Sequence, residues 1–322
     1  MQEIDSLLQT VMFTIYGNQY ESREEHLLLT MFQVHSLIHK TDRQMVLAHQ
    51  FEETTEFSNL LRQNTPVSRM MTTYTRRGPG QLYLKNVLGN RINSLIEHSD
   101  LNLEINPLKI HEELTKLEEE KNPSGEIRPG VTAEEAAQNK AVQETLPARV
   151  EILMQVASSF LNTIIESIDQ VPYGIRWICK QIRSLTKRKF PDATEVAVCT
   201  QIGGFFFLRY INPAIVTPQA YMLIDNCPEE QPRRTLTLIA KMLQNLANKP
   251  SYAKEPYMVH LAPFIDTNKA RMNAFLNKLC EVPDFYDTLE VYPCKSLLIV
   301  DGSIYCIVKE GCQDQHYAQR DL

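Results

Sequence analysis

The spacing of apolar residues constrains this chain more than any other feature of its sequence. Between Val150 and Ile168 apolar side chains recur every three or four positions, which is the period of a helix with one buried face. Strict alternation, which is typical of half-buried strands, is absent until residues 296–300 and 304–308, where it predicts a hairpin around Asp301-Gly302. The sequence therefore predicts an all-helical body and an ambiguous tail from about Val282.

Capping patterns indicate where several helices begin. An apolar stripe over residues 4–15 ends at Gly17, and Ser22 with Glu25 fits a capping box at the start of the next helix. Thr132 with Glu135 fits a second capping box. We read the polar segment 121–130 before it as a surface loop rather than a domain boundary.

One further helix is predicted to be the most buried of the molecule. Asp192 with Glu195 would cap its start, and apolar residues lie on every face as far as Leu208. Asn212-Pro213 should end it, because proline disfavours helical geometry at the preceding residue. The domain boundaries that we expect are 1–281 for the helical domain, with a core at about 27–279, and 282–322 for an extension.

Composition and charge exclude several functions. The 322 residues include 33 basic and 39 acidic residues, for a net charge of −6, which argues against a dedicated nucleic-acid binder. No stretch approaches the roughly 20 apolar residues that cross a bilayer, and Met1–Asp5 lacks the features of a signal peptide. The seven cysteines form no C-x-x-C pair, so we expect reduced thiols and a cytoplasmic protein.

Motifs of self-contained catalysis are also missing from the sequence. There is no P-loop, no H-E-x-x-H, no dinucleotide fingerprint and no G-x-S-x-G. His35 and His39 have the spacing of metal ligands, but no third ligand lies near them in sequence, and a surface helix explains both. We therefore expect neither a metal nor a cofactor in this chain.

Two polar features require an explanation. Arg209 follows the apolar run Phe205–Leu208, and an arginine is costly to desolvate there without a partner for its donors. Capping the carbonyls at the end of its own helix is one such partnership. In the predicted helix 235–248, polar residues recur at helical spacing along one face, which alone indicates solvent exposure; they are Lys241, Gln244, Asn245 and Asn248.

Three segments in this order resemble the Ras GTPase-activating protein (RasGAP) family: 207–218, 243–248 and 254–258. The resemblance extends over about residues 27–279. Segments 75–81 and 131–136 resemble its IQGAP-type branch, whose members often lack the catalytic arginine and bind GTPases without accelerating hydrolysis.

This chain differs from that branch because Arg62–Met71 resembles the finger loop of active members. The resemblance is therefore to an IQGAP-like Ras regulator of the fungal type that retains its arginine finger. It implies a multi-helix bundle with a shallow GTPase-binding groove.

The resemblance also implies roles for individual residues. Arg62 would be the arginine finger, and its main-chain carbonyl would hold the glutamine of the GTPase that orients the attacking water. Arg209 would hydrogen-bond the finger loop and hold it in shape. Lys241 and Glu255 would form an ion pair that braces the groove, and four residues would face the bound GTPase: Leu208, Gln244, Asn248 and Lys254.

The chemistry of phosphoryl transfer explains why such a role needs arginine. Charge spreads over the γ-phosphate oxygens in the transition state, and a Ras-type GTPase has no arginine of its own to stabilise it. A guanidinium is permanently charged and presents its donors in a rigid fork, whereas lysine is a hydrated point charge. GTP, GDP and Mg²⁺ would belong to the partner's pocket, and the chain itself would not act on free GTP.

Three functions remain open from the sequence. The first is a RasGAP domain that acts on a GTP-loaded Ras-family protein and reaches the inner face of the membrane through that partner. The second is an IQGAP-like scaffold that binds a Rho-family GTPase without accelerating hydrolysis. The third is a helical interaction module with no GTPase partner, which the number of matching segments disfavours.

Overall fold

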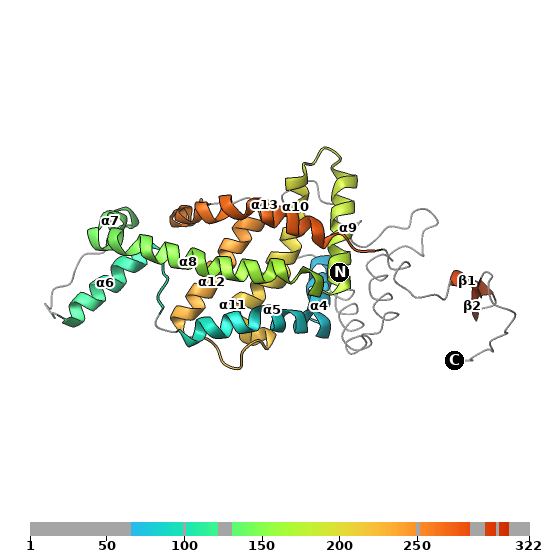
Figure 1. Cartoon of the computed structure of the whole chain (residues 1–322), viewed down its shortest axis with the longest axis horizontal. Coiled ribbons are helices and arrows are strands. Elements are labelled where there is room, and N and C mark those ends of the chain that lie inside the picture. Colours follow the sequence, from blue (N-terminus) through green and yellow to red (C-terminus); the bar gives the residue numbers. More distant parts are fainter. Residues whose placement is uncertain are drawn as a thin grey trace. The chain divides into compact units, whose positions relative to one another are not determined.

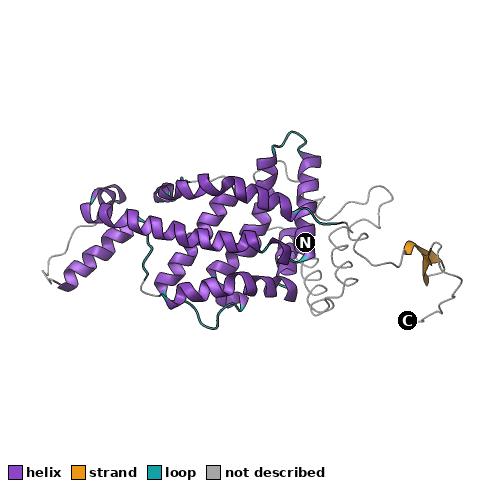
Figure 2. Ribbon diagram, viewed as in Figure 1, coloured by secondary structure: helices purple, strands orange, loops and turns teal. Residues whose placement is uncertain are grey.

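Helices account for almost all of the first 279 residues wherever the structure describes them (Figures 1 and 2). This computed structural model describes residues 66–98, 101–121, 131–248, 252–283, 294–300 and 303–308. The chain divides into two units between Val282 and Pro283. The first unit is helical, which confirms the predicted all-α fold class.

The α-helices of this unit are α4 (Pro66–Thr75), α5 (Gly78–Glu97), α6 (Pro107–Lys121), α7 (Ala133–Gln138), α8 (Lys140–Glu166), α9 (Tyr173–Lys189), α10 (Glu195–Phe205), α11 (Asn212–Val216), α12 (Glu230–Ala247) and α13 (Ala262–Leu279). The short 3-10 turns are η3 (Ile168–Gln170), η5 (Pro218–Tyr221) and η6 (Pro256–Leu261), and η4 (Phe206–Ile211) is a π-helical turn.

The long helix α8 runs along the middle of the unit (Figure 1). It packs against α5, α12 and α13, while α6 and α7 contact it nearer its start. The predicted stripe from Val150 is present, but the helix begins earlier, at Lys140. The cause is Asn139, whose side chain accepts hydrogen bonds from the backbone N–H groups of Ala141 and Val142.

Two helix starts test the capping predictions. The capping box of Thr132 and Glu135 is confirmed, because each side chain accepts a hydrogen bond from the other residue's backbone N–H. The prediction that Asp192 caps the next helix is wrong. Thr194 occupies the N-cap of α10, and its hydroxyl accepts from the N–H of Ala197. Asp and Thr are both good N-cap residues. The three-residue spacing from Asp192 to Glu195 therefore favours the wrong one.

The predicted end of this buried helix is also wrong. After α10 the chain continues through η4 into α11, so Asn212-Pro213 starts a short helix instead of closing a long one. Pro213 lies in the first turn of α11, where its missing N–H is not needed. The π turn η4 lies directly before α11 and joins it to α10.

A glycine lets α10 and α12 approach closely. A Cβ atom at Gly203 would lie 2.8 Å from the carbonyl oxygen and 3.0 Å from the Cβ of Ala247, which is closer than any side chain tolerates. Ala247 is the last residue of α12. Gly203 therefore determines how closely α10 approaches the end of α12.

The second unit contains a two-stranded antiparallel sheet of β1 (Cys294–Val300) and β2 (Ser303–Val308). Ile299 pairs with Ile304 and Val300 with Ser303, which confirms the predicted hairpin.

Several predictions fall outside the described residues. They are the helices expected over residues 4–15 and after Ser22, the loop at 122–130, the His35 and His39 pair, and Arg62. Within the ranges that are described, no helix combines the length and apolar character needed to cross a membrane.

Candidate GTPase-binding site

The π turn exposes two neighbouring side chains of an otherwise buried segment. Phe206, Phe207, Tyr210 and Ile211 are completely buried. Leu208 in contrast keeps 39% of its surface exposed, and Arg209 is half-buried. A π turn inserts an extra residue into the helical repeat and so turns the following side chains to a new direction. Partial burial lowers the pKa of Arg209, yet a guanidinium stays charged in proteins.

Tyr210 attaches this turn to the junction of α4 and α5. Its buried hydroxyl donates to the carbonyl oxygen of Gly80 at 2.6 Å, and its ring stacks on Tyr83 with 6.0 Å between centroids. Tyr83 in turn shares a 2.9 Å hydrogen bond with Ser167. Since α4 also contacts η4, the exposed pair Leu208 and Arg209 has a fixed position next to α4.

A hydrogen bond between two amides joins α11 to α12. Asn212 Nδ2 donates to Gln244 Oε1 at 2.8 Å. Three amide atoms here are buried and have no hydrogen-bond partner in the part of the chain that is described: Asn212 Oδ1, Gln244 Nε2 and Asn248 Oδ1. Buried polar atoms are nearly always paired in folded proteins. These three atoms are sealed off from a partner, but the residues Lys241, Gln244, Asn245 and Asn248 are each only half-buried and form a polar face along α12.

An ion pair connects α12 to the segment before η6. Lys241 Nζ lies 2.6 and 2.7 Å from the two carboxylate oxygens of Glu255. Burial alone would raise the pKa of Glu255, but hydrogen bonds from Lys241 and Tyr257 outweigh it and lower that pKa. Lys254, the residue before Glu255, is exposed.

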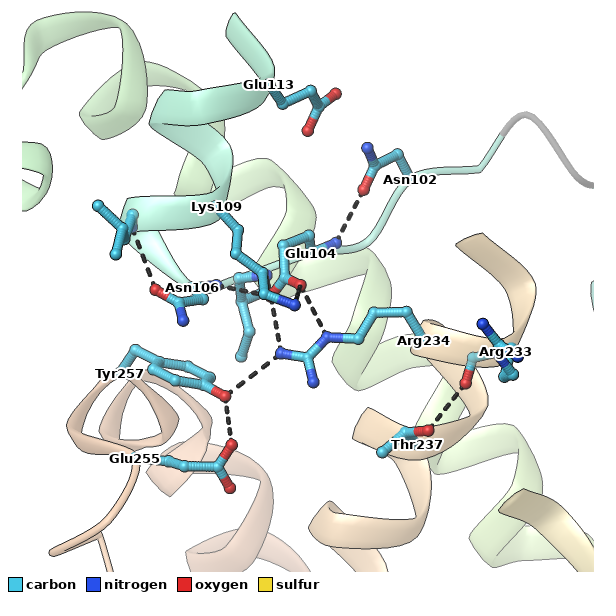
Figure 3. A network of polar contacts seen from close by, with 12 residues as sticks. Asn102, Glu104, Asn106, Lys109, Glu113, Arg233, Arg234, Thr237, Glu255 and Tyr257 are labelled. Atoms are coloured by element: carbon cyan, nitrogen blue, oxygen red, sulfur yellow. Dashed lines mark hydrogen bonds and ion pairs between the residues drawn. The ribbon is translucent and has the colours of Figure 1, made fainter. Parts of the chain in front are cut away.

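This ion pair belongs to a longer polar network, which Figure 3 shows from close by. The Tyr257 hydroxyl donates to Glu255 Oε1 and accepts from Arg234 Nη2 at 3.3 Å. Arg234 also donates to both carboxylate oxygens of Glu104, at 2.7 and 3.0 Å. The network thus runs from Lys241 to Glu104, which lies 130 residues before Arg234 in the chain.

Glu104 is the most buried member of the network, with a side chain only 9% exposed. Its carboxylate accepts from the backbone N–H groups of Ile105 and Asn106 at 3.0 and 2.9 Å. Burial would raise its pKa, yet the hydrogen bonds from Arg234 and Asn106 lower it below its ordinary value. The bonds to Glu104 raise the pKa of Arg234, so both groups stay charged at neutral pH.

Three of the sequence-predicted site residues take part in these bonds: Gln244, Lys241 and Glu255. Leu208 and Arg209 lie one turn before Asn212, which bonds Gln244, and Asn248 follows one turn later along α12. One turn earlier on the same helix, Lys241 pairs with Glu255 beside Lys254. Arg62 lies outside the described residues.

Sequence reasoning missed four residues of this region: Asn212, Tyr257, Arg234 and Glu104. Asn212 and Tyr257 stand inside segments that resemble the family, but the pattern gives them no partner. A signal does exist for Glu104, because it is a carboxylate between the apolar residues Leu103 and Ile105. Such a charge needs a buried partner.

Of the adjacent cations Arg76 and Arg77, only the second is buried. Arg77 is 5% exposed, and its guanidinium lies over the Tyr74 ring, 5.5 Å from the centroid. Arg76 donates to the Tyr221 hydroxyl at 3.1 Å and lies over that ring. Both cations are used within the fold, where aromatic faces stabilise them.

Neither a metal centre nor a reactive thiol stands out in the residues described. No group of three or more His, Cys, Asp and Glu side chains within those ranges could hold a metal ion. Burial raises the pKa of the Cys199 thiol, which disfavours the thiolate that a nucleophile needs.

Comparison with known proteins places the site in a family. Residues 43–248 match the family model described as GTPase-activator protein for Ras-like GTPase. The Ras GTPase-activating-like protein gapA of Dictyostelium discoideum is 31% identical over 294 residues, which cover 90% of this chain and 33% of that protein. The human Ras GTPase-activating-like protein IQGAP2 is 29% identical over 315 residues, which cover 96% of this chain and 19% of that protein.

Human Ras GTPase-activating protein 1 is 27% identical over 289 residues, which cover 88% of this chain and 24% of that protein. The chain thus spans about a third or less of the length of these curated relatives. Because the family model matches more than half of the sequence, the chain belongs to the RasGAP family.

Proposed function

We propose that this chain stimulates GTP hydrolysis by a Ras-family GTPase and so switches that GTPase off. It binds the GTP-loaded form in the cytoplasm and inserts Arg62 into the partner's nucleotide site. The partner GTPase also recruits it to the inner face of the membrane. Membership of the RasGAP family supports a small GTPase of the Ras type as the partner.

The observation that carries the proposal is the half-buried polar face of α12 beside an exposed leucine. Gln244 and Asn248 lie on that face, the bond from Asn212 to Gln244 joins it to α11, and Leu208 is exposed on the adjoining π turn. A partner can hydrogen-bond the accessible part of these amides. It also covers the apolar side chain, as the centre of a protein interface does.

The position of the finger in the sequence fits this surface. Arg62 precedes Pro66, the first residue of α4, by four residues, a distance of at most about 14 Å along an extended chain. α4 contacts the π turn that carries Arg209. In the proposed complex Arg209 bonds the finger loop, which keeps the guanidinium of Arg62 in a productive position.

The α12 side of the surface supplies charge and rigidity. Lys254 is exposed and meets acidic groups of the partner. The Lys241–Glu255 ion pair keeps the segment that carries Lys254 against α12.

Single-turnover GTP hydrolysis tests the proposal. A panel of Ras, Rap and Rho proteins is loaded with GTP and mixed with the wild type, Arg62→Ala or Arg188→Ala. Arg188 is an exposed arginine in the last turn of α9 and serves as the control. We expect strong acceleration on a Ras protein by the wild type and the control, and little by Arg62→Ala, which should still bind the GTP-loaded form.

A second candidate is a scaffold that binds a GTP-loaded Rho-family protein. The observation in its favour is the similarity to human IQGAP2 over 96% of this chain. In that case a Rho protein binds, and its hydrolysis rate is the same with the wild type and with Arg62→Ala. Equal rates on every GTPase of the panel would replace the first proposal by this one.

A further inference from the structure

Tyr257 is the junction of two ion pairs that come from distant parts of the chain. Its hydroxyl donates to Glu255 of the Lys241 pair and accepts from Arg234 of the Glu104 pair. In Figure 3 the dashed contacts to Glu255 and Arg234 meet at this oxygen. Removing this one atom disconnects the two halves of the network.

The two halves differ in rigidity. Glu104 is held by Arg234 through two hydrogen bonds and by two backbone N–H groups, and its side chain is 9% exposed. A fork-shaped guanidinium on a carboxylate gives a well-defined geometry. This half of the network is therefore a fixed anchor.

The other half is weaker. The side chains of Lys241 and Glu255 are 37% and 32% exposed, so solvent and salt screen their attraction. Lysine is also a flexible point charge that does not fix an orientation. Without a further contact, the Lys241 pair would leave Glu255 and its neighbour Lys254 with considerable freedom.

We propose that Tyr257 is a positioning residue for GTPase binding, because its hydroxyl connects the Glu104–Arg234 anchor to Glu255 and so holds the segment bearing Lys254 against α12. The inference rests on the proposed function and adds a determinant of affinity to it. In the proposed complex Tyr257 does not touch the reacting atoms, and the anchor affects only the binding of the GTPase. Its loss therefore changes binding and leaves the chemical step alone.

The variant Tyr257→Phe removes the hydroxyl and keeps the ring. Steady-state activation of a GTP-loaded Ras protein should show a KM increased about five- to tenfold, which corresponds to the net loss of one ordinary hydrogen bond, and a kcat within about twofold of the wild type. Tyr252→Phe is the matched control, because Tyr252 lies on the same segment and its raised pKa comes from burial and the charge of Asp266 rather than from a hydrogen bond. The control should leave both constants unchanged.

A double variant tests whether Arg234 and Tyr257 act through the same connection. Arg234→Lys cannot hold Glu104 with two bonds and reach Tyr257 as well. The single variant should raise KM, and adding Tyr257→Phe should raise it little further, because the contact is already lost. Additive effects of the two changes would overturn the shared connection.

The outcomes separate this inference from the proposed function. If the wild type accelerates hydrolysis and Tyr257→Phe has an unchanged KM, or loses kcat alone, the inference is wrong and the function stands. If the wild type binds a GTPase loaded with a non-hydrolysable GTP analogue but accelerates no GTPase, the function is wrong. In that case the dissociation constant for the GTPase replaces KM: the inference stands if Tyr257→Phe raises that constant and fails if it does not. Failure to bind any GTPase of the panel would overturn both.

Discussion

At the residue scale, single hydroxyl groups hold the exposed part of the site in place. Tyr210 is completely buried, and its hydroxyl bonds the carbonyl oxygen of Gly80, 130 residues away in sequence. The bond attaches the π turn with Leu208 and Arg209 to the start of α5. Burial raises the pKa of Tyr210, so the hydroxyl keeps its proton and remains a donor.

Tyr210→Phe should destabilise the protein by about 1 kcal/mol, because it removes a buried hydrogen bond, while the Gly80 carbonyl keeps its helical donor in α5. Urea unfolding followed by circular dichroism measures this free energy. Tyr252→Phe, at a half-buried tyrosine, should change it by less than about 0.5 kcal/mol. A Tyr210→Phe protein as stable as the wild type would show that the bond does not hold the turn.

At this scale the sequence predicts which residue types matter better than it predicts their partners. The segments that resemble the family are sufficient to indicate Arg209, Gln244, Lys241 and Glu255. They give no reason to join Glu104 to Arg234 or Tyr257 to Glu255, because helical spacing identifies faces and does not say which faces meet. Those contacts follow from packing between segments far apart in the chain.

At the element scale, α10, η4 and α11 follow one another without a break. The sequence instead predicts one helix that ends at Asn212-Pro213. The apolar run correctly predicts its burial. Asn212-Pro213 predicts an end, although a proline in the first turn of a following helix is well tolerated. The π turn η4, between α10 and α11, has no distinct pattern of residues, so the spacing of apolar residues cannot predict it.

Two adjacent glycines of α10 should respond to the same substitution in opposite directions. Gly203→Ala places a Cβ 2.8 Å from the carbonyl oxygen of Ala247 and should cost about 1 to 3 kcal/mol through overpacking. At Gly204 nothing lies within 4 Å of the added Cβ, so Gly204→Ala should stabilise by about 0.5 to 1 kcal/mol through helix propensity.

Thermal unfolding of the two variants measures both effects, and GTPase activation shows whether the helix spacing matters for the site. Since Ala247 adjoins Asn248, we expect Gly203→Ala to weaken activation and Gly204→Ala to preserve it. Destabilisation of similar size in both variants would contradict the close approach of α10 and α12.

At the scale of the whole molecule, the Glu104–Arg234 pair ties the segment before α6 to α12. The pKa of Glu104 is lower in the folded protein than its ordinary value of 4.5. The unfolded chain therefore binds a proton more readily, and stability from this group is complete above about pH 4.5. That stability is lost as the pH falls through the lowered pKa of the folded state.

Glu104→Gln should lower the free energy of unfolding by about 3 kcal/mol at pH 7, because it leaves Arg234 without its charged partner. The difference between wild type and variant should shrink as the pH falls below 4.5, because the unfolded wild-type chain takes up a proton first, and it is smallest once the pH has passed the lowered pKa of the folded protein. Urea titrations at several pH values provide the comparison. A difference that is constant from pH 7 to pH 3 would show that the carboxylate charge contributes nothing.

Much of the overall architecture is accessible from the sequence. The 3.6-residue period indicates an all-helical body, the capping box at Thr132 marks α7, and alternation marks the hairpin β1–β2. The helix starts at Asn139 and Thr194 are harder to predict, because several good capping residues compete near each start. The finger at Arg62 is inferred from resemblance and remains a proposal.

The central claim is that Arg62 completes the active site of a GTPase, and single-turnover GTP hydrolysis on a Ras protein tests it most directly. Arg62→Ala and Arg62→Lys should both lose most of the acceleration, because neither presents a guanidinium to the developing charge. Known trans arginines in Ras complexes contribute about 10³ to 10⁵ in rate, a size taken from those complexes and not from this structure. If either variant accelerated hydrolysis as well as the wild type, the catalytic account would be contradicted.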